Sequence, residues 1–237
     1  MPELRRHRQA HVGVRRMTDI PIIFSAPMVR ALLEGRKTMT RRLAWQFKTL
    51  PAQKPDGSLH TSKMWQCFSS NGDGIETWRR HSPWQKVKVG DRLWVRESAC
   101  FTIDQGTRKP AKTEWFLADG ENPYRDNFTV KSRPSIHMPR WASRITLVVT
   151  ETKIQLLQGI SEMDACAEGC EEDWADGLPV WYVPGGGMSR HRATGEECFE
   201  WLWSSLHGVE SWEANPDVVA LTFTVHQQNI DAMDAPA

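Results

Sequence analysis

The sequence predicts an α+β domain, a partly closed β-barrel with a few short helices and long inserted loops. Strand-favouring segments alternate with few, short helical segments, and the connections between them are long. The 237 residues, 40% hydrophobic and 25% charged, are enough to bury the core of one large domain. The expected organisation is a basic extension over 1–16, one domain over 17–226 with insertions at about 45–85, 104–135 and 170–200, and a tail over 227–237.

The first expected elements are a strand over 20–24 and a helix over 27–34. The strand is an apolar run that ends before Ser25, which is a suitable N-cap. Pro27 fits the first turn of a helix, and apolar residues then recur at helical spacing as far as Gly35, which favours a helix end.

Residues 45–85 are expected to be loop-like because they contain several proline and glycine turn signals. Residues 87–95 predict a tight turn that leads into a strand. Residues 114–118 are a candidate strand, and residues 119–135 are again expected to be loop-like.

The clearest predicted strand covers 141–152, where β-branched and other apolar residues alternate with threonines. The sequence Ser161-Glu-Met-Asp164 is an N-cap signature. It predicts a helix over 162–168, which Gly169 ends.

The last third predicts an irregular loop, a helix and a final strand. Residues 175–195 include Gly185-Gly-Gly187, which neither follows a predicted strand nor carries the lysine of a phosphate-binding loop. Residues 196–206 have an amphipathic pattern that predicts a helix. Residues 218–225 predict the closing strand.

The net charge of +1 conceals a basic N-terminal segment. Residues 1–16 hold five arginines and one glutamate, a combination that can bind phosphates. They lack the apolar stretch of a secretory signal, and Met17 is an alternative start of the chain. No apolar run approaches the roughly 18 residues of a membrane-spanning helix. We expect a soluble, cytoplasmic protein with no membrane partner.

The cysteine pattern predicts no metal centre. Five cysteines are spaced irregularly, form no Cys-x-x-Cys pair, and have no zinc-site spacing to the eight histidines. Cys166 and Cys170 are expected to share a helix face, but two thiols rarely suffice to bind a metal. We expect reduced cysteines and no cofactor.

The chain is unusually rich in tryptophan, with 12 Trp against 8 Phe and 2 Tyr. Tryptophan stacks well on nucleobases, but it also fills space beneath loops. We expect most of these residues to serve packing and one or two to serve binding.

The segment over 35–42 carries the strongest functional signal. Basic residues gather around two threonines just beyond the expected helix end; they are Arg30, Arg36, Lys37, Arg41 and Arg42. One interpretation is a solvated basic loop that neutralises the C-terminal carbonyls of the helix. The other is a site for a phosphate or for a reaction.

The sequence Gly35-Arg-Lys37-Thr-Met-Thr40-Arg-Arg42 resembles the signature of the ASCH domain, a β-barrel relative of the PUA RNA-binding domain. That signature is written G-x-K-x-x-E-x-R, and this chain departs from it at Thr40. The departure resembles the bacterial ASCH subgroup of N4-acetylcytidine amidohydrolases, whose motif is G-R-K-T-x-T-x-R. The resemblance implies a PUA-like barrel.

Other segments resemble the family in the expected order and cover about half of the chain; they are 89–95, 144–150, 157–168 and 219–223. The whole chain is similar to longer, tryptophan-rich ASCH proteins of phages and prophages, in which a segment like 133–141 is typical. The insertions have no counterpart in the minimal enzymes.

The resemblance implies that Thr40 is a nucleophile, Lys37 a base and Glu168 an acid/base. A threonine hydroxyl needs a neighbour that takes its proton, and a lysine does so only when burial or nearby cations lower its pKa. Three residues apart, Lys37 and Thr40 point the same way in a helical turn and opposite ways in a strand, so their spacing leaves the geometry open. The arginines at 36, 41 and 42 are expected to lower the pKa of Lys37.

Each role has a plainer alternative. Thr40 is also explained as a strand residue on a basic surface, and Lys37 and Arg42 as phosphate ligands without catalysis. Glu168 is one of six acidic residues between 162 and 173, so a solvated helix end explains it equally well.

Further residues are candidates for binding substrate or RNA; they are Arg36, Arg41, Arg42, Trp94, Glu97, His137, Arg140 and Trp141. Glu97 follows a predicted strand and either points into the barrel mouth or forms a surface salt bridge. His137, Arg140 and Trp141 either line a nucleotide pocket or pack within a loop.

The leading hypothesis is an amidohydrolase that removes an acyl group from a cytosine nucleoside without a metal. One alternative is a non-catalytic reader of RNA or of a modified base, of phage or prophage origin; another is a metal-independent ribonuclease. The salt dependence distinguishes the amidohydrolase from the reader. Binding through phosphates weakens steeply as the salt concentration rises, whereas turnover of a neutral nucleoside does not. The partner in every case is a nucleoside or RNA.

Overall fold

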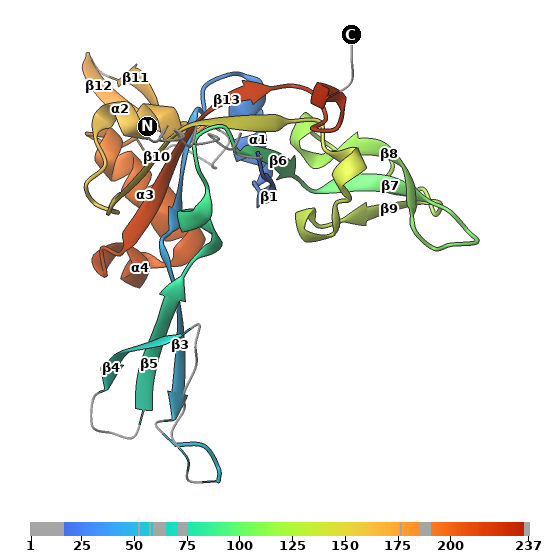
Figure 1. The fold of residues 1–237 in the computed structure, drawn as a ribbon. Helices are drawn as coiled ribbons and strands as arrows, with labels where there is room; N and C mark the ends of the chain where they lie inside the picture. Colours follow the sequence, from blue (N-terminus) through green and yellow to red (C-terminus); the bar gives the residue numbers. More distant parts are fainter. Residues whose placement is uncertain are drawn as a thin grey trace, which may run out of the picture.

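The computed structural model describes residues 17–51, 53–56, 58, 65–70, 75–175, 177–184 and 191–234, and it has an α+β fold with mostly strands (Figure 1). The basic extension over 1–16 and the triplet Gly185-Gly-Gly187 lie outside these residues. None of the described helices is long and apolar enough to cross a membrane.

A five-stranded mixed sheet forms the centre of the molecule. Its order is β1-β6-β10-β13-β2, with β1 parallel to β6 and every other neighbouring pair antiparallel. The strands are β1 Asp19–Ile23, β6 Arg92–Arg96, β10 Thr146–Leu156, β13 Asp217–His226 and β2 Met39–Leu43.

The central sheet is open rather than a closed barrel. In the described part of the chain β1 and β2 are its two edges and do not pair with each other. A side chain links them instead, because Arg42 Nη2 donates to the carbonyl oxygen of Ile23 at 2.9 Å. The α+β class is therefore confirmed, while closure of the barrel is not.

The helices are few and short, as predicted. The helix predicted over 162–168 has those bounds in the structure, and those predicted over 27–34 and 196–206 differ by a residue at each end. The helices are α1 Ala26–Leu33, α2 Glu162–Glu168, α3 Gly195–His207 and α4 Val209–Glu213. Short 3-10 turns cover Pro83–Lys86, Leu117–Asp119, Ser135–His137, Arg140–Ala142 and Ala232–Asp234.

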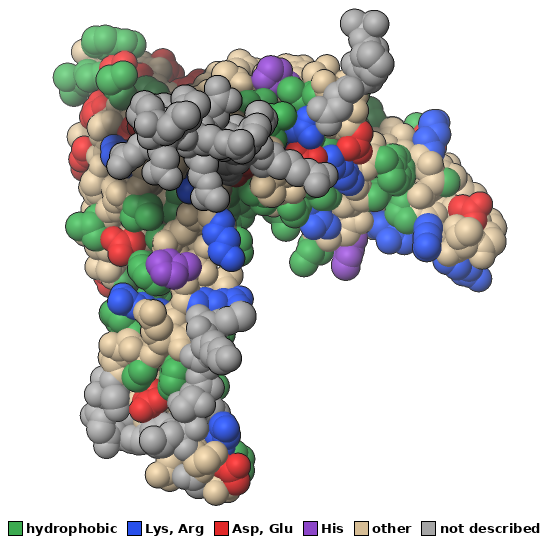
Figure 2. Space-filling model, viewed as in Figure 1, with side chains coloured by type: hydrophobic (Ala, Val, Ile, Leu, Met, Phe, Trp, Pro, Cys, Tyr) green, Lys and Arg blue, Asp and Glu red, His purple; other side chains and the backbone are tan. Residues whose placement is uncertain are grey.

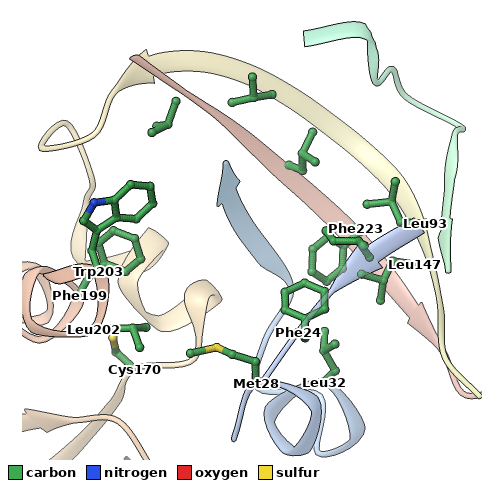
Figure 3. Packing of buried hydrophobic residues seen from close by; sticks show 14 of the residues in the cluster. Phe24, Met28, Leu32, Leu93, Leu147, Cys170, Phe199, Leu202, Trp203 and Phe223 are labelled. Atoms are coloured by element: carbon green, nitrogen blue, oxygen red, sulfur yellow. The ribbon is translucent and has the colours of Figure 1, made fainter. Parts of the chain in front are cut away.

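The main core lies between the central sheet and the helices. Figure 3 shows Phe24 and Phe223 on one side and Phe199 and Trp203 of α3 on the other, with Met28 between them. These side chains belong to one buried cluster. The apolar face predicted for 196–206 is therefore the face that packs, since Phe199, Leu202 and Trp203 are buried.

The prediction that residues 45–85 form a loop is wrong. The chain builds a second sheet there, with the order β3-β5-β4. Most of its turn signals lie between strands, and its strands are only partly buried, so they lack the apolar alternation that marks a half-buried strand. The strands are β3 Trp45–Pro51, β4 Gln66–Ser70 and β5 Ile75–His81.

The β3–β5–β4 sheet joins the central sheet around Ala44. Ala44, which is fully buried, lies between β2 and β3, and its amide donates to the carbonyl oxygen of Asp217 at 2.9 Å. The chain returns at Ser82, whose amide donates to the carbonyl oxygen of Ala44 at 2.9 Å. The backbone of one buried residue, Ala44, thus contacts both the central sheet and the residue at which the insertion ends.

Two further predicted loops also contain strands. A three-stranded sheet of order β8-β7-β9 includes part of 119–135, and a hairpin includes part of 175–195. In Figure 1 the β8–β7–β9 and β3–β5–β4 sheets project from the central body in different directions, and Figure 2 shows the same two projections in solid form. The strands are β7 Ala99–Ile103, β8 Pro110–Phe116, β9 Val130–Arg133, β11 Glu171–Ala175 and β12 Leu178–Tyr182.

A buried ion pair lies where the chain passes from the central sheet into β7. Glu97 is 1% exposed and accepts two hydrogen bonds from Arg144, at 2.9 and 3.1 Å. Arg144 also pairs with Asp119 at 2.7 Å. Burial raises the pKa of Glu97, and the contact with Arg144 opposes that shift.

Glu97→Ala is expected to lower the free energy of unfolding by about 2–3 kcal/mol, because it removes the buried partner of Arg144 while Asp119 remains. Urea unfolding followed by tryptophan fluorescence measures this difference. Glu121→Ala, at an exposed position, is the control. A Glu97→Ala protein as stable as the control would contradict the structural role.

Candidate active site

The segment that resembles the ASCH signature is held by backbone hydrogen bonds to two helices. Gly35 follows α1 with φ +75°, a conformation that glycine adopts without strain. Beyond this turn, the amide of Lys37 donates to the carbonyl oxygen of Ala31 at 3.0 Å, and the amide of Thr38 donates to that of Ala167 at 2.8 Å. The segment is thus placed between α1 and α2 before it enters β2.

The structure brings Lys37 and Glu168 into direct contact although they lie 131 residues apart. Lys37 Nζ donates to Glu168 Oε2 at 2.6 Å and to the backbone oxygen of Glu168 at 2.8 Å. Arg41 Nη1 donates to the other carboxylate oxygen, Oε1, at 3.2 Å. Lys37 and Arg41 are each 2% exposed, and Glu168 is 3% exposed. One buried carboxylate therefore holds two buried cations, which excludes a solvated helix end.

Helix α2 supplies a second carboxylate to this network. Ser161 caps the helix by accepting a hydrogen bond from the amide of Asp164 at 3.2 Å, which confirms the predicted N-cap. Arg41 Nη2 pairs with Asp164 at 2.6 Å. Asp164 and Glu168 are four residues apart, the spacing that places side chains on one helix face.

Burial is the main cause of the lowered pKa of Lys37. Removal of the ammonium group from water lowers the pKa, and the charge and hydrogen bond of Glu168 raise it. Arg42 lowers it further. Of the three arginines expected to lower the pKa of Lys37, only Arg42 does so. Arg36 lies nearer the surface, where it pairs with Glu34 and Glu171, and Arg41 pairs with Glu168 and Asp164.

Lys37 and Thr40 line the same cavity, with a volume of about 40 Å³. Thr40 lies in β2 and is 2% exposed, and its hydroxyl has no hydrogen-bond partner among the described residues. Arg42 lies over the ring of Phe24 at 5.1 Å. The cavity is also lined by Met28, Arg41, Glu168, Phe199, Leu202, Trp203, Leu206 and His207.

A larger groove of about 670 Å³ adjoins this cavity and shares Arg41, Arg42, Trp203 and His207 with it. Four tryptophans line it, and we call it the tryptophan groove. Its other residues come from β2, from the first residues of β3 and from the turn after β5. They are Leu43, Trp45, Gln46, Phe47, Ser82 and Trp84, together with Trp65, which immediately precedes β4.

Six of the residues predicted to bind substrate line neither the cavity nor the groove, and Arg36 is one of them. Trp94 lies in β6 and is contacted by Arg96 at 5.4 Å. Glu97 forms a salt bridge, as one of the two alternatives expected, but it does so with Arg144 in the interior rather than at the surface.

The segment around His137 packs outside the site. His137 is exposed, and Trp141 packs edge-on against Phe101 with ring centroids 6.1 Å apart. Arg140 pairs with Asp19 and with Asp231, both at 2.6 Å, and these contacts raise its pKa. These interactions match the prediction of loop packing rather than that of a nucleotide pocket.

Sequence reasoning missed several residues of the site. Asp164 was recognisable from its spacing to Glu168. The amphipathic pattern of 196–206 marked Trp203 as a residue of the apolar helix face, but we expected that face to serve packing alone. No local sequence pattern identified Trp84 or Ser82 as site residues. Their positions depend on where the chain re-enters the central body after the β3–β5–β4 sheet.

Comparison of the chain with protein-family models, curated proteins and solved structures found no match. The resemblance of 35–42 to the ASCH signature therefore stays a prediction. In the described part of the chain no group of three or more His, Cys, Asp or Glu residues is placed to hold a metal ion.

Glu168→Gln is expected to lower the free energy of unfolding by about 3 kcal/mol, because two buried cations lose their shared anion. Asp164→Asn is expected to cost less, about 1 kcal/mol, because the Asp164 side chain is 20% exposed. Urea unfolding of both variants measures the difference. Glu172→Gln, at an exposed position, is the control, and an equal loss for all three would contradict the buried network.

Proposed function

We propose that the chain is an amidohydrolase that removes an acyl group from the exocyclic amine of a cytosine nucleoside. The observation that carries this proposal is the convergence of Lys37, Thr40 and Glu168 on one buried cavity. These are the three residues to which the resemblance to the ASCH amidohydrolases assigns catalytic roles. The curved central sheet, whose edges are linked through Arg42, supports the corresponding proposal of a PUA-like barrel.

In the proposed reaction Thr40 Oγ1 attacks the acyl carbonyl carbon. The threonine proton passes to Nζ of Lys37 in its neutral form, and a carbon–oxygen bond forms. The carbon–nitrogen bond then breaks, and the departing amine takes the proton from Lys37. Water hydrolyses the acyl-threonine ester, giving a carboxylic acid and free Thr40 again. Burial favours the neutral lysine that this reaction requires.

Glu168 has two functions in this proposal. Its carboxylate and its backbone oxygen fix Nζ of Lys37 from two directions, at 2.6 and 2.8 Å. The same carboxylate exchanges protons with Lys37 as the lysine accepts and returns a proton. Arg41, held by Glu168 and Asp164, keeps the carboxylate in place.

The alternative of a non-catalytic reader is favoured by one observation, the ion pair itself. A lysine paired with a carboxylate at 2.6 Å is stabilised in its charged form, and a charged lysine is not a base. The experiment below distinguishes a reader from an enzyme, and cleavage of unmodified RNA in the same assay would indicate the ribonuclease.

Thr40→Val and Lys37→Met are each expected to abolish release of cytidine from N4-acetylcytidine, with a loss of about 10³-fold, because they remove the nucleophile and the base. Chromatography measures the product, and circular dichroism checks folding. Thr38→Val is the matched control, since Thr38 lies two residues from Thr40 and does not line the cavity. Hydrolysis that survives Thr40→Val would contradict the nucleophile, and no release by the natural sequence would favour the reader.

The pH dependence of kcat/KM is expected to rise to a plateau with an inflection below the ordinary pKa of lysine, because burial lowers the pKa of Lys37. Glu168→Gln is expected to move the inflection to lower pH, since it removes the group that raises this pKa. Arg42→Gln is expected to move it to higher pH, since it removes a positive charge. Shifts of the same sign in both variants would contradict Lys37 as the titrating base.

A further inference from the structure

The cavity that contains Lys37 and Thr40 is small, with a volume of about 40 Å³. A ligand larger than a nucleoside, such as a nucleic-acid strand, must extend beyond it. The tryptophan groove, at about 670 Å³, has the size of a ligand site and shares four lining residues with the cavity.

Two buried donors at the groove lack partners. Ser82 Oγ and Arg41 Nε are buried and make no hydrogen bond among the described residues, and both residues are 2% exposed. Both residues line the groove. A buried donor without an acceptor is costly, so an acceptor atom of a bound ligand would relieve this cost at both positions. These donors indicate a polar ligand in a groove whose walls are mainly aromatic.

The β3–β5–β4 sheet carries cations that no carboxylate neutralises in the described part of the chain. Lys48 lies over the ring of Trp65 at 4.5 Å, and Arg79 contacts Trp45 at 4.5 Å and Phe68 at 4.8 Å. Aromatic rings hold these cations in place but leave their charge available to an anion.

The charge of the whole insertion is consistent with an anionic partner. Residues 45–85 contain five basic and three acidic residues, although the net charge of the complete chain is only +1. Figure 2 shows lysine and arginine side chains gathered where the β3–β5–β4 sheet leaves the central body. A row of cations along an exposed sheet suits a chain of phosphates better than a single one.

Exposed rings lie among these cations. Phe47 and Phe68 are 48% and 54% exposed, and they contact each other edge-on with centroids 5.7 Å apart. Register pairs Phe47 with Arg79, so aromatic and basic side chains alternate across β3 and β5. Aromatic rings interleaved with cations on an open sheet bind unpaired bases by stacking and the backbone by charge.

We propose that the tryptophan groove and the adjoining face of the β3–β5–β4 sheet bind a single-stranded nucleic acid, which places one base of the strand beside the Lys37–Thr40 cavity. The binding of the strand depends only on the groove and the sheet. That the strand is the substrate rests on the proposed hydrolysis. The substrate is then an acylated cytosine within a polynucleotide rather than a free nucleoside.

The test measures fluorescence anisotropy of the full chain with a labelled oligocytidylate of about 12 nucleotides, a length within the range of known single-strand sites. RNA, DNA and the corresponding duplex are titrated at about 50 and 200 mM salt. Binding of either single strand, weaker at the higher salt, is expected, and the ratio of the two affinities identifies the preferred polymer. Duplex bound as tightly as the single strands would overturn the proposal, because paired bases cannot stack on the rings.

Matched variants test the stacking. Phe47→Ala and Trp65→Ala are each expected to weaken single-strand binding about tenfold. Phe128→Ala is the control, since Phe128 is 90% exposed and lies outside the groove. Equal affinities of the Phe47 and Phe128 variants would overturn the assignment of the groove.

A second pair of variants tests the charge. Lys48→Gln combined with Arg79→Gln is expected to reduce the slope of log K against log salt by about 1.4, or about 0.7 for each phosphate contact. Lys109→Gln combined with Lys131→Gln changes the same charge on the β8–β7–β9 side and is expected to leave the slope unchanged. Equal slopes of the two double variants would contradict phosphate contacts on the β3–β5–β4 sheet.

Hydrolysis of free N4-acetylcytidine is assayed on the same preparation. Hydrolysis without strand binding would overturn this inference and leave the proposed function intact. A third outcome is strand binding with no hydrolysis of free N4-acetylcytidine or of an oligonucleotide that contains it. That outcome would support the binding site but overturn the inference that the bound strand is a substrate.

Discussion

The contact between Glu168 and the two cations Lys37 and Arg41 is the interaction on which the arrangement of the molecule depends. A carboxylate buried to 3% exposure is tolerated because Lys37 and Arg41 hydrogen-bond to both of its oxygens, and each cation is tolerated for the same reason. The contact joins the last residue of α2 to the segment before β2 and to β2 itself. Neither side is stable in a buried position without the other, so the network determines how α2 docks against the edge of the central sheet.

The same network explains how much of the site was predictable. Lys37 and Thr40 were recognisable because the pattern of 35–42 is local, and the bounds of α2 were predicted because its cap and its terminal glycine are local too. The pairing of Lys37 with Glu168 is not a local property. Burial selects this one of six neighbouring acidic residues, and burial depends on the packing of α2 against β2, which one sequence does not reveal. For the same reason the cause of the lowered pKa of Lys37 was assigned to neighbouring charge rather than mainly to burial.

Fold prediction failed in the insertions for a related reason. The central strands carry buried apolar residues, so their periodicity was visible, as in β10 and β13. The strands of the β3–β5–β4 and β8–β7–β9 sheets are held by hydrogen bonds between polar, partly exposed segments, and such pairing leaves little hydrophobic pattern. Glu97 shows the same limitation, because its position after a strand suggested the mouth of a barrel or a surface salt bridge, whereas it pairs with Arg144 in the interior.

The closure at Ala44 has an evolutionary consequence. The two ends of the β3–β5–β4 insertion meet at Ala44, whose carbonyl oxygen accepts from the amide of Ser82 at the edge of the central sheet. The free energy of closing a loop grows only slowly with its length, so such an edge accepts segments of very different size without rearrangement of the strands beside it. The cavity built by β2, α2 and α3 can therefore stay the same while the segment inserted at this edge is lengthened, shortened or exchanged. The range of ligands would then change by replacement of the inserted segment, with the cavity unaltered.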